Sequence, residues 1–193
     1  MPDLTGPVLP AGTLAGRPQP VLPTGDGLVL RPWRAEDAPA VHAAFQDPLI
    51  HQWHVRSADS VAEVAGWIEE WTAGWAGERI AQWAVADADT DRLLGRAALR
   101  EIHLGDGMAE VAYWTTAAAR GRGVAARATT ALARWALDEI GLHRLELLHA
   151  TANQASCRVA AKAGFTLEGT KRSALLHVDG WHDMHLHARV RGD

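Results

Sequence analysis

The stretch from Ala109 to Ala126 constrains the fold most, because three local patterns follow one another in it without a gap. The apolar run Ala109–Trp114 predicts a short strand, and the small residues at 115–119 predict a turn. Arg120-Gly121-Arg122-Gly123 then opens a helix. Apolar residues recur at helical spacing beyond these glycines, so we expect the helix to run from about Arg122 to Ile140.

The glycine turn before this helix predicts an anion-binding site. The first turn of a helix has unpaired backbone N–H groups, with the positive end of the helix dipole behind them. Glycines tolerate positive φ and let a phosphate or pyrophosphate approach the backbone closely. Arg120, Arg122 and Arg127 add positive charge nearby. The alternative is that Gly121 and Gly123 only turn the chain and cap the helix.

Two common nucleotide-binding motifs do not fit this turn. A dinucleotide fingerprint needs a third glycine after two further residues, and Gly121 and Gly123 are not followed by one. A P-loop needs Gly-Lys-Ser/Thr, which is also missing at this turn. The ligand is therefore expected to be a phosphorylated cofactor held in another way.

Length, charge and cysteine content limit the class of protein. A chain of 193 residues predicts one domain with a sizeable core. The net charge of −4 argues against a nucleic-acid partner, which requires a basic face. The single cysteine, Cys157, excludes an intrachain disulfide and fits a reducing compartment. With no apolar run of membrane-spanning length and no signal peptide, we expect a cytoplasmic protein without a membrane partner; a homodimer stays open.

The remaining patterns divide the chain into an extension and one domain. Residues 1–26 are rich in Pro and Gly and predict an extended tail, partly disordered or draped on a neighbour. Residues 27–193 form the domain. Its expected strands are 28–32, 80–86, 92–102, 109–114, 143–149, one from 165 and 182–190. Its other helices begin near 36, after a cap at Ser57 or Ser60, and at 153–156, with a loop or broken helix at 49–56. This order indicates a mixed α/β layer rather than a regular doubly wound sheet.

Three motifs in the expected order resemble the GNAT superfamily of N-acetyltransferases. Residues 120–125 fit its Arg/Gln-x-x-Gly-x-Gly/Ala signature, which holds the pyrophosphate of acetyl-coenzyme A. Residues 153–156, followed by 162–165, resemble the segment after the fifth strand. Gly180-Trp181-His182-Asp183 and Leu28-Val29-Leu30-Arg31-Pro32 resemble the branch that acetylates the N-termini of ribosomal proteins. The resemblance covers about residues 27–190.

The resemblance implies an α/β (α+β) fold of the GNAT type. The expected sheet is mixed and twisted, has about seven strands and is flanked by about four helices. Its two central parallel strands splay apart, and the pantetheine arm of acetyl-CoA lies in the split. The cofactor-binding residues implied are Val111, Ala112, Tyr113, Trp114, Arg120, Gly121, Arg122, Gly123, Val124, Ala125, Ala126, Asn153 and Ser156.

Two catalytic residues are predicted, and each has a structural alternative. Ser156 resembles the serine near the sulfur in the ribosomal-protein branch, where it assists thiolate departure, while Asn153 or Ser156 could instead cap the short helix. Glu110 could remove the proton of the acceptor ammonium, directly or through water, or it could pair with an arginine such as Arg96 or Arg100. Leu175 stands where this branch can have a glutamate proposed as the base.

The histidines and tryptophans give further candidates. His177, His182, His185 and His187 crowd the last hairpin, and with Asp183 they could suggest a metal, but a solvated strand face is favoured and no metal is expected. In the last strand we expect Met184, Leu186, Ala188 and Val190 to point inward and Asp183, His185, His187 and Arg189 to point outward. His51, Trp53 and His54 fall where the family has its acceptor loop, and Trp53 and Trp114 are the candidates for the cleft.

The sequence therefore predicts an acetyl-CoA-dependent N-acetyltransferase that acts by direct transfer in a ternary complex. The acceptor is a protein N-terminus, such as that of a ribosomal protein, or a small-molecule amine. The alternatives are a non-catalytic acyl-CoA-binding module, which Leu175 favours, and a nucleotide-binding protein that uses the same loop.

Overall fold

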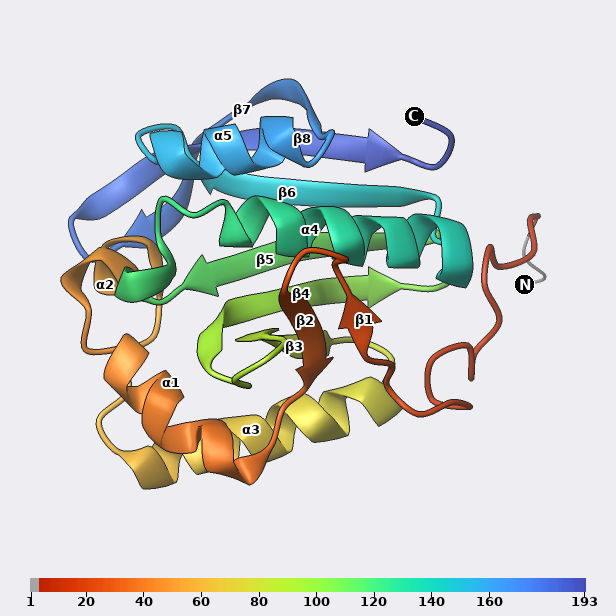
Figure 1. The fold of residues 1–193 in the computed structure, drawn as a ribbon. Coiled ribbons are helices and arrows are strands. Elements are labelled where there is room, and N and C mark those ends of the chain that lie inside the picture. The colour runs from red at the N-terminus through yellow and green to blue at the C-terminus, as the bar shows by residue number, and fades with distance from the viewer. Residues whose placement is uncertain (1–3) are drawn as a thin grey trace.

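A computed structural model describes residues 4–193, which form a mixed sheet in the strand order β1-β2-β3-β4-β5-β6-β8-β7 (Figure 1). The strands are β1 (Leu22–Pro23), β2 (Leu28–Pro32), β3 (Ala81–Asp87), β4 (Leu93–His103), β5 (Met108–Thr115), β6 (Arg144–Ala150), β7 (Thr166–His177) and β8 (Gly180–Val190). The helices are α1 (Ala38–Ala44), α2 (Pro48–Trp53), α3 (Val61–Ala76), α4 (Val124–Arg134) and α5 (Gln154–Lys162). The predicted fold class is confirmed.

Helices cover both faces of the sheet. In Figure 1, α4 and α5 lie over β5 and β6, and a core that contains Trp83, Leu132 and Leu145 fills the space beneath α4. On the other face, α1 and α3 pack through Val41 and Val64. Successive residues of β3 point to opposite faces, so Trp83 and Ala84 belong to different cores. The sheet therefore lies between two hydrophobic layers.

The two central parallel strands separate along their length, as expected. β5 and β6 pair only over Met108–Glu110 with Arg144–Glu146. Beyond these pairs β5 continues to Thr115 and remains paired with β4, while β6 continues to Ala150 paired with β8. Within residues 4–193, the backbone edge of β5 that faces β6 thus has no strand partner after Glu110, which leaves its polar groups available to a ligand.

Helical caps explain where the site-forming helices begin and end. Gly123 is the N-cap of α4 in the left-handed conformation, and a π-helical segment, Trp135–Ile140, continues α4 to Gly141. The predicted end at Ile140 is confirmed, although the last turns are π-helical. The segment at 49–56, expected as a loop or broken helix, contains α2, which Asp47 caps through the N–H of Leu49.

The N-terminal extension packs on its own domain over the described residues. The carboxylate of Glu78 accepts hydrogen bonds from the N–H groups of Gly12 and Leu14, at 2.7 and 2.6 Å, and Leu14 is only 2% exposed. The indole N–H of Trp83 donates to the carbonyl of Pro20. β1 then adds to the edge of β2, which gives one more strand than expected. Part of the predicted tail, residues 1–3, lies outside the described residues.

The prediction of a solvated histidine face on the last hairpin is wrong for two of its members. His187 and His177 are buried, at 3% and 6% exposure. The strand β8 lies between β6 and β7 rather than at an edge, and Cys157 of α5 faces His187. Met184 and Ala188 are buried as expected, so β8 is covered on both faces around these residues.

None of the helices in residues 4–193 combines the length and apolar character needed to cross a membrane.

Candidate active site

A cavity of about 570 Å³ opens at the point where β5 and β6 separate. Its walls come from α2, the end of β5, the turn into α4 and the face of α5. Ten of the predicted residues line it: Tyr113, Trp114, Arg120, Gly121, Gly123, Val124, Ala125, Ala126, Asn153 and Ser156. Glu110, Val111, Ala112 and Arg122 are not among the lining residues. The structure thus brings most of the predicted binding site together around one space.

The turn before α4 presents a row of backbone donors. Gly121 and Gly123 have φ values of +74° and +73°, so both adopt a conformation that other residues rarely take. The first backbone hydrogen bond of the helix runs from the N–H of Arg127 to the carbonyl of Gly123, at 3.1 Å. Within the described chain, the six N–H groups of residues 121–126 have no acceptor. Successive N–H groups at a helix N-terminus favour an anion.

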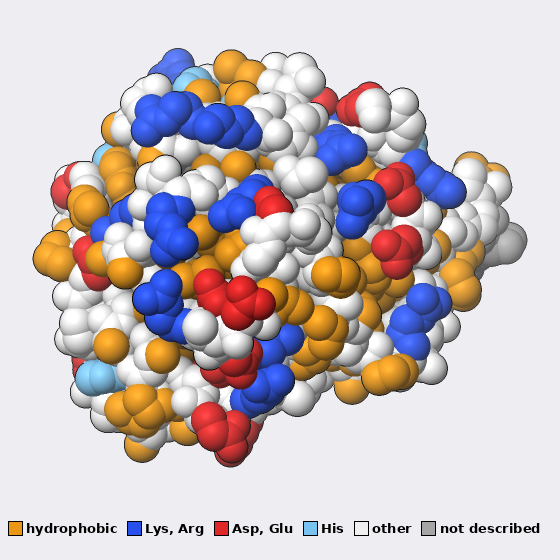
Figure 2. Space-filling view, viewed as in Figure 1, with side chains coloured by type: hydrophobic (Ala, Val, Ile, Leu, Met, Phe, Trp, Pro, Cys, Tyr) orange, Lys and Arg blue, Asp and Glu red, His pale blue; other side chains and the backbone are white. Residues whose placement is uncertain are grey.

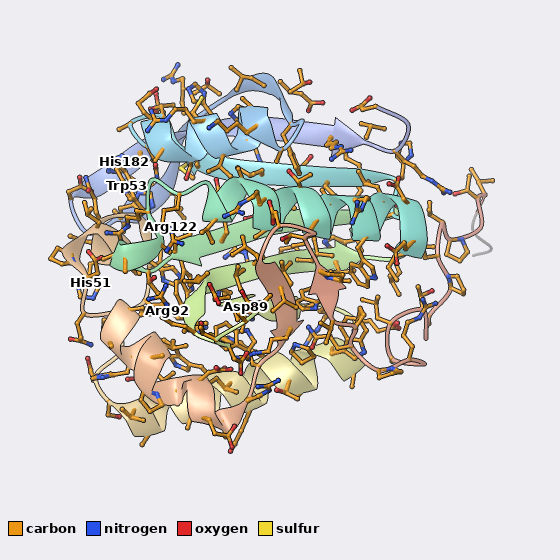
Figure 3. The ribbon with its side chains drawn as sticks, viewed as in Figure 1. His51, Trp53, Asp89, Arg92, Arg122 and His182 are labelled. Carbon is orange, nitrogen blue, oxygen red and sulfur yellow. The ribbon has the colours of Figure 1, made fainter. Side chains whose placement is uncertain are left out.

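Positive side chains surround these donors, although two of the predicted cations are already paired. Arg120 forms an ion pair with Asp47 at 2.7 Å, and Arg127 pairs with Asp26 at 3.0 Å. Arg158 and Lys162 of α5 line the cavity, and neither forms an ion pair with a described residue. Figure 2 shows Lys and Arg side chains gathered over α5 and the start of α4, and Figure 3 places Arg122 at that turn.

Sequence reasoning missed Arg158 and Lys162. They lie four residues apart on α5, so they project from one face of the helix, and Asn153 and Ser156 line the same cavity. That spacing is the signal that could have identified them.

The strand β5 contributes a phenol as well as backbone groups. The Tyr113 hydroxyl donates to the backbone carbonyl of Ser156, at 3.3 Å, and the side chain lines the cavity. Burial raises the pKa of Tyr113 to about 12, so the phenol stays protonated near neutral pH. Its side chain thus links the split strand to the first turn of α5.

Asn153 has the capping role that the sequence left open. Its side-chain Oδ1 accepts a hydrogen bond from the N–H of Ser156, at 3.0 Å, which makes Asn153 the N-cap of α5. Both residues also line the cavity. The cap leaves the Asn153 NH₂ group and the Ser156 hydroxyl without a partner within residues 4–193, so both can face a ligand.

Glu110 forms one of the arginine pairs considered from the sequence. Its carboxylate accepts a charged hydrogen bond from Arg100, the residue directly opposite on β4. The side chain is 22% exposed. The lining of the cavity, within the described chain, contains no Asp or Glu at all.

Two arginines lie close to His54 at the end of the cavity near α2. His54 lines it, and burial together with Arg96 and Arg100 lowers the pKa of His54 to about 3. Arg96 is 8% exposed, and burial together with the neighbouring Arg100 and Arg56 lowers its pKa to about 9. The imidazole of His54 is therefore neutral at physiological pH.

Aromatic side chains form the wall at this end. Trp53 and Trp114 both line the cavity, in agreement with their assignment as cleft candidates. Trp53 lies edge-on to His177 and His182, each at 5.9 Å between ring centroids, and Figure 3 shows it beside His182. His51 instead contacts the carbonyl of Phe45 through Nε2 and does not line the cavity.

Comparison with known proteins agrees with this architecture. The chain is 25% identical to the N-acetyltransferase YoaA of Bacillus subtilis over 173 residues, which cover 89% of this chain and 97% of that protein. It is 30% identical to the ribosomal-protein-serine acetyltransferase of Escherichia coli over 100 residues, 52% of this chain and 56% of the relative.

Solved structures show the same fold. The chain superimposes on RimL, a ribosomal L7/L12 alpha-N-protein acetyltransferase solved with coenzyme A, with a TM-score of 0.82 and 20% identity. That match covers 89% of this chain and 98% of RimL. The sequence model of the acetyltransferase (GNAT) domain matches residues 27–166, and the chain therefore belongs to the GNAT acetyltransferase family.

Proposed function

We propose that this protein transfers an acetyl group from acetyl-CoA to an α-amino group, by direct attack in a ternary complex. The observation that carries the proposal is the row of six N–H groups at 121–126, which have no acceptor among the described residues and open on the split between β5 and β6. RimL, whose fold the chain shares, was solved with coenzyme A. The cytoplasm is the proposed location, because the curated relative in Escherichia coli is named for a ribosomal protein.

The chain offers fitting contacts to the diphosphate and to the pantetheine arm of coenzyme A. The 121–126 amides suit the diphosphate, and Arg158 and Lys162 add cations beside it. The unpaired edge of β5 at Val111, Ala112 and Tyr113 suits the amides of the pantetheine arm. The Asn153 NH₂ group can donate to the same arm. The cavity size lies in the usual range for small-ligand sites.

The charge around His54 favours an acceptor that is already neutral. An ammonium ion is repelled by buried Arg96, whereas the charge of Arg100 is paired with Glu110, and none of the described lining residues is a carboxylate that would attract the ion. At pH 7.5 about a third of free α-amino groups are neutral, compared with about 0.1% of lysine side chains. A site whose positive charge repels ammonium ions therefore selects α-amines over ε-amines. Neutral His54 already accepts a hydrogen bond from the N–H of Arg56 at Nδ1, and with a pKa of about 3 it is too weak a base to deprotonate the amine.

The transfer itself needs few residues. Acetyl-CoA supplies the acetyl group as a reactive thioester. A β5 amide beyond Glu110 stabilises the developing oxyanion, and the Ser156 hydroxyl donates to the departing sulfur. Water accepts the proton of the amine. Glu110, predicted as the base, acts in this proposal only through such water, because Arg100 holds its carboxylate.

The proposal is tested with two matched peptides and acetyl-CoA as the donor. One peptide has a free N-terminus and no lysine; the other has a blocked N-terminus and one internal lysine. We expect the first to be acetylated with a kcat/KM at least 100-fold higher at pH 7.5. Equal rates would contradict α-amine selection. Saturable acetyl-CoA binding without transfer to any amine would instead indicate an acyl-CoA-binding module.

A further inference from the structure

We propose that His149, Cys157 and His187 form a binding site for a zinc ion between α5 and the sheet. The three residues come from β6, α5 and β8, and one possible ligand atom from each lies within 4.8 Å of the other two. Thiolate and imidazole together are the donor set that Zn²⁺ prefers in proteins. The site is separate from the proposed acetyl transfer, and neither proposal depends on the other.

The two imidazoles already have nearly the spacing that a tetrahedral ion requires. Nε2 of His149 and Nε2 of His187 lie 3.1 Å apart. Two nitrogens bound to one tetrahedral Zn²⁺ at about 2.0–2.1 Å are separated by about 3.4 Å, and a sulfur and a nitrogen by about 3.6 Å. The sulfur of Cys157 lies within 4.8 Å of both nitrogens, so it has to approach them by about 1 Å at most to complete this geometry.

A backbone carbonyl fixes the tautomer of His149. Nδ1 of His149 lies 2.8 Å from the carbonyl oxygen of Ala150, and because a carbonyl can only accept, Nδ1 must be the protonated nitrogen. The lone pair is therefore on Nε2 and points toward His187. Orientation of one ring nitrogen by a backbone carbonyl is the usual support for a metal-binding histidine.

The protonation of His187 can adapt to a bound ion. Its Nε2–H is the donor to His149, which leaves the lone pair on Nδ1; this atom is buried and has no partner among the described residues. With an ion between the rings, Nε2 of His187 binds the metal and the proton moves to Nδ1, where the backbone of Phe165 is the nearby acceptor. Cys157 binds as the thiolate and releases its proton to solvent, so each ion bound releases one proton.

The surroundings favour a site with three protein ligands and one open position. His149 and His187 are 5% and 3% exposed, whereas Cys157 is partly exposed. Cys157 follows Ser156 in α5, and Ser156 lines the active-site cavity. A bound ion would therefore fix the first turn of α5 to β6 and β8. His185 lies near His149, at 5.5 Å between ring centroids, but the Thr170 hydroxyl contacts its Nδ1, so it serves as the control.

The experiment titrates Co²⁺, a spectroscopic substitute for Zn²⁺, into the chelator-treated, reduced full-length protein. We expect one equivalent to bind, with visible bands of tetrahedral cobalt and a thiolate-to-cobalt charge-transfer band, and Zn²⁺ to displace it. Cys157→Ser should abolish the charge-transfer band and weaken binding at least tenfold, and His187→Gln should weaken binding to a similar extent. His185→Gln should change the affinity by less than twofold.

The outcomes separate the zinc site from a plain histidine pair in the core. Absence of saturable Co²⁺ binding, or a cobalt spectrum that Cys157→Ser leaves unchanged, would overturn the proposal. Equal losses in His185→Gln and His187→Gln would also overturn it, because they would indicate nonspecific histidine binding. If His187→Gln does not fold, the nearly isosteric Cys157→Ser, at a partly exposed position, decides the result by itself.

Discussion

Gly123 and Gly141 cap the two ends of the same long helical segment. Replacing each with alanine therefore separates an effect on coenzyme A binding from an effect on folding stability. Both adopt positive φ, +73° and +93°. A Cβ at Gly123 would meet no atom within 4 Å, and one at Gly141 would meet only ordinary contacts, at 3.6 and 3.7 Å. Both substitutions therefore cost the same kind of backbone strain without a clash. Gly123 differs because it lines the cavity.

The two expected magnitudes follow from this geometry. An alanine held at positive φ costs about 1–2 kcal/mol, so each variant should lose that much unfolding free energy. For a chain of this length the melting temperature should fall by about 2–8 °C in both. In Gly123→Ala, relaxation of the strained turn misplaces at least two N–H donors from a diphosphate. Each such charged hydrogen bond is worth about 1.5–3 kcal/mol, so two of them are worth at least about 3 kcal/mol and coenzyme A should bind at least about 100-fold more weakly.

The assay is isothermal titration of each variant with coenzyme A, alongside a thermal melt. Gly141→Ala should match the wild-type affinity within about twofold while it loses similar stability. If Gly123→Ala binds coenzyme A as tightly as Gly141→Ala does, the backbone-cradle reasoning is refuted.

Three further predictions concern other residues. Ser156→Ala should lower kcat about tenfold with little change in KM for acetyl-CoA, because one hydrogen bond to the departing sulfur is worth about 1.5 kcal/mol; steady-state kinetics that showed a purely KM effect would contradict this. Well above pH 6.5, His54 is neutral in both the folded and the unfolded protein. Below pH 6.5 the imidazole takes up a proton in the unfolded protein but not in the folded one, where its pKa is about 3. The free energy of unfolding therefore falls as the pH falls from 6.5 toward 3. Between pH 7.5 and 5.0 the His54→Phe variant should lose about 2 kcal/mol less of this free energy than the wild type does, as measured by urea denaturation. Asp37→Asn should cost about 3 kcal/mol in urea denaturation, because it leaves buried Arg31 without its bidentate partner, whereas Asp91→Asn at the exposed end of the same network should cost about 1 kcal/mol or less.

The parts of the site set by local chain chemistry could be predicted from the sequence. The glycine turn, the helix to Ile140 and the capping residue Asn153 depend on neighbours within a few positions, and the structure has all three. The split between β5 and β6 was expected only through the family resemblance, because no local pattern determines where two parallel strands separate.

The parts that depend on tertiary neighbours could not be predicted in the same way. Whether Glu110 meets Arg96 or Arg100 depends on the register of β4 with β5, which places Arg100 opposite Glu110 and Arg96 opposite Trp114. Alternation correctly placed His187 on the face opposite to Met184 and Ala188, but the prediction that this face points outward is wrong. His187 lies opposite Leu147, a residue of the main core, and α5 packs on the same face. The sequence also could not predict that His149 and Cys157 lie beside His187, because the three residues belong to β6, α5 and β8 and meet only in the folded protein.

Amide NMR of the labelled full-length protein tests the central claim most directly, namely that the N–H groups of residues 121–126 hold the diphosphate of the donor. On addition of coenzyme A we expect large chemical-shift changes at the amides of Gly121 and Gly123. The same amides should respond to ADP, which contains the adenosine and the diphosphate but no pantetheine arm. The amide of Gly141, at the far end of the helical segment, should stay within the small range of indirect effects. Saturation with coenzyme A while the 121–126 amides remain unmoved would contradict the account.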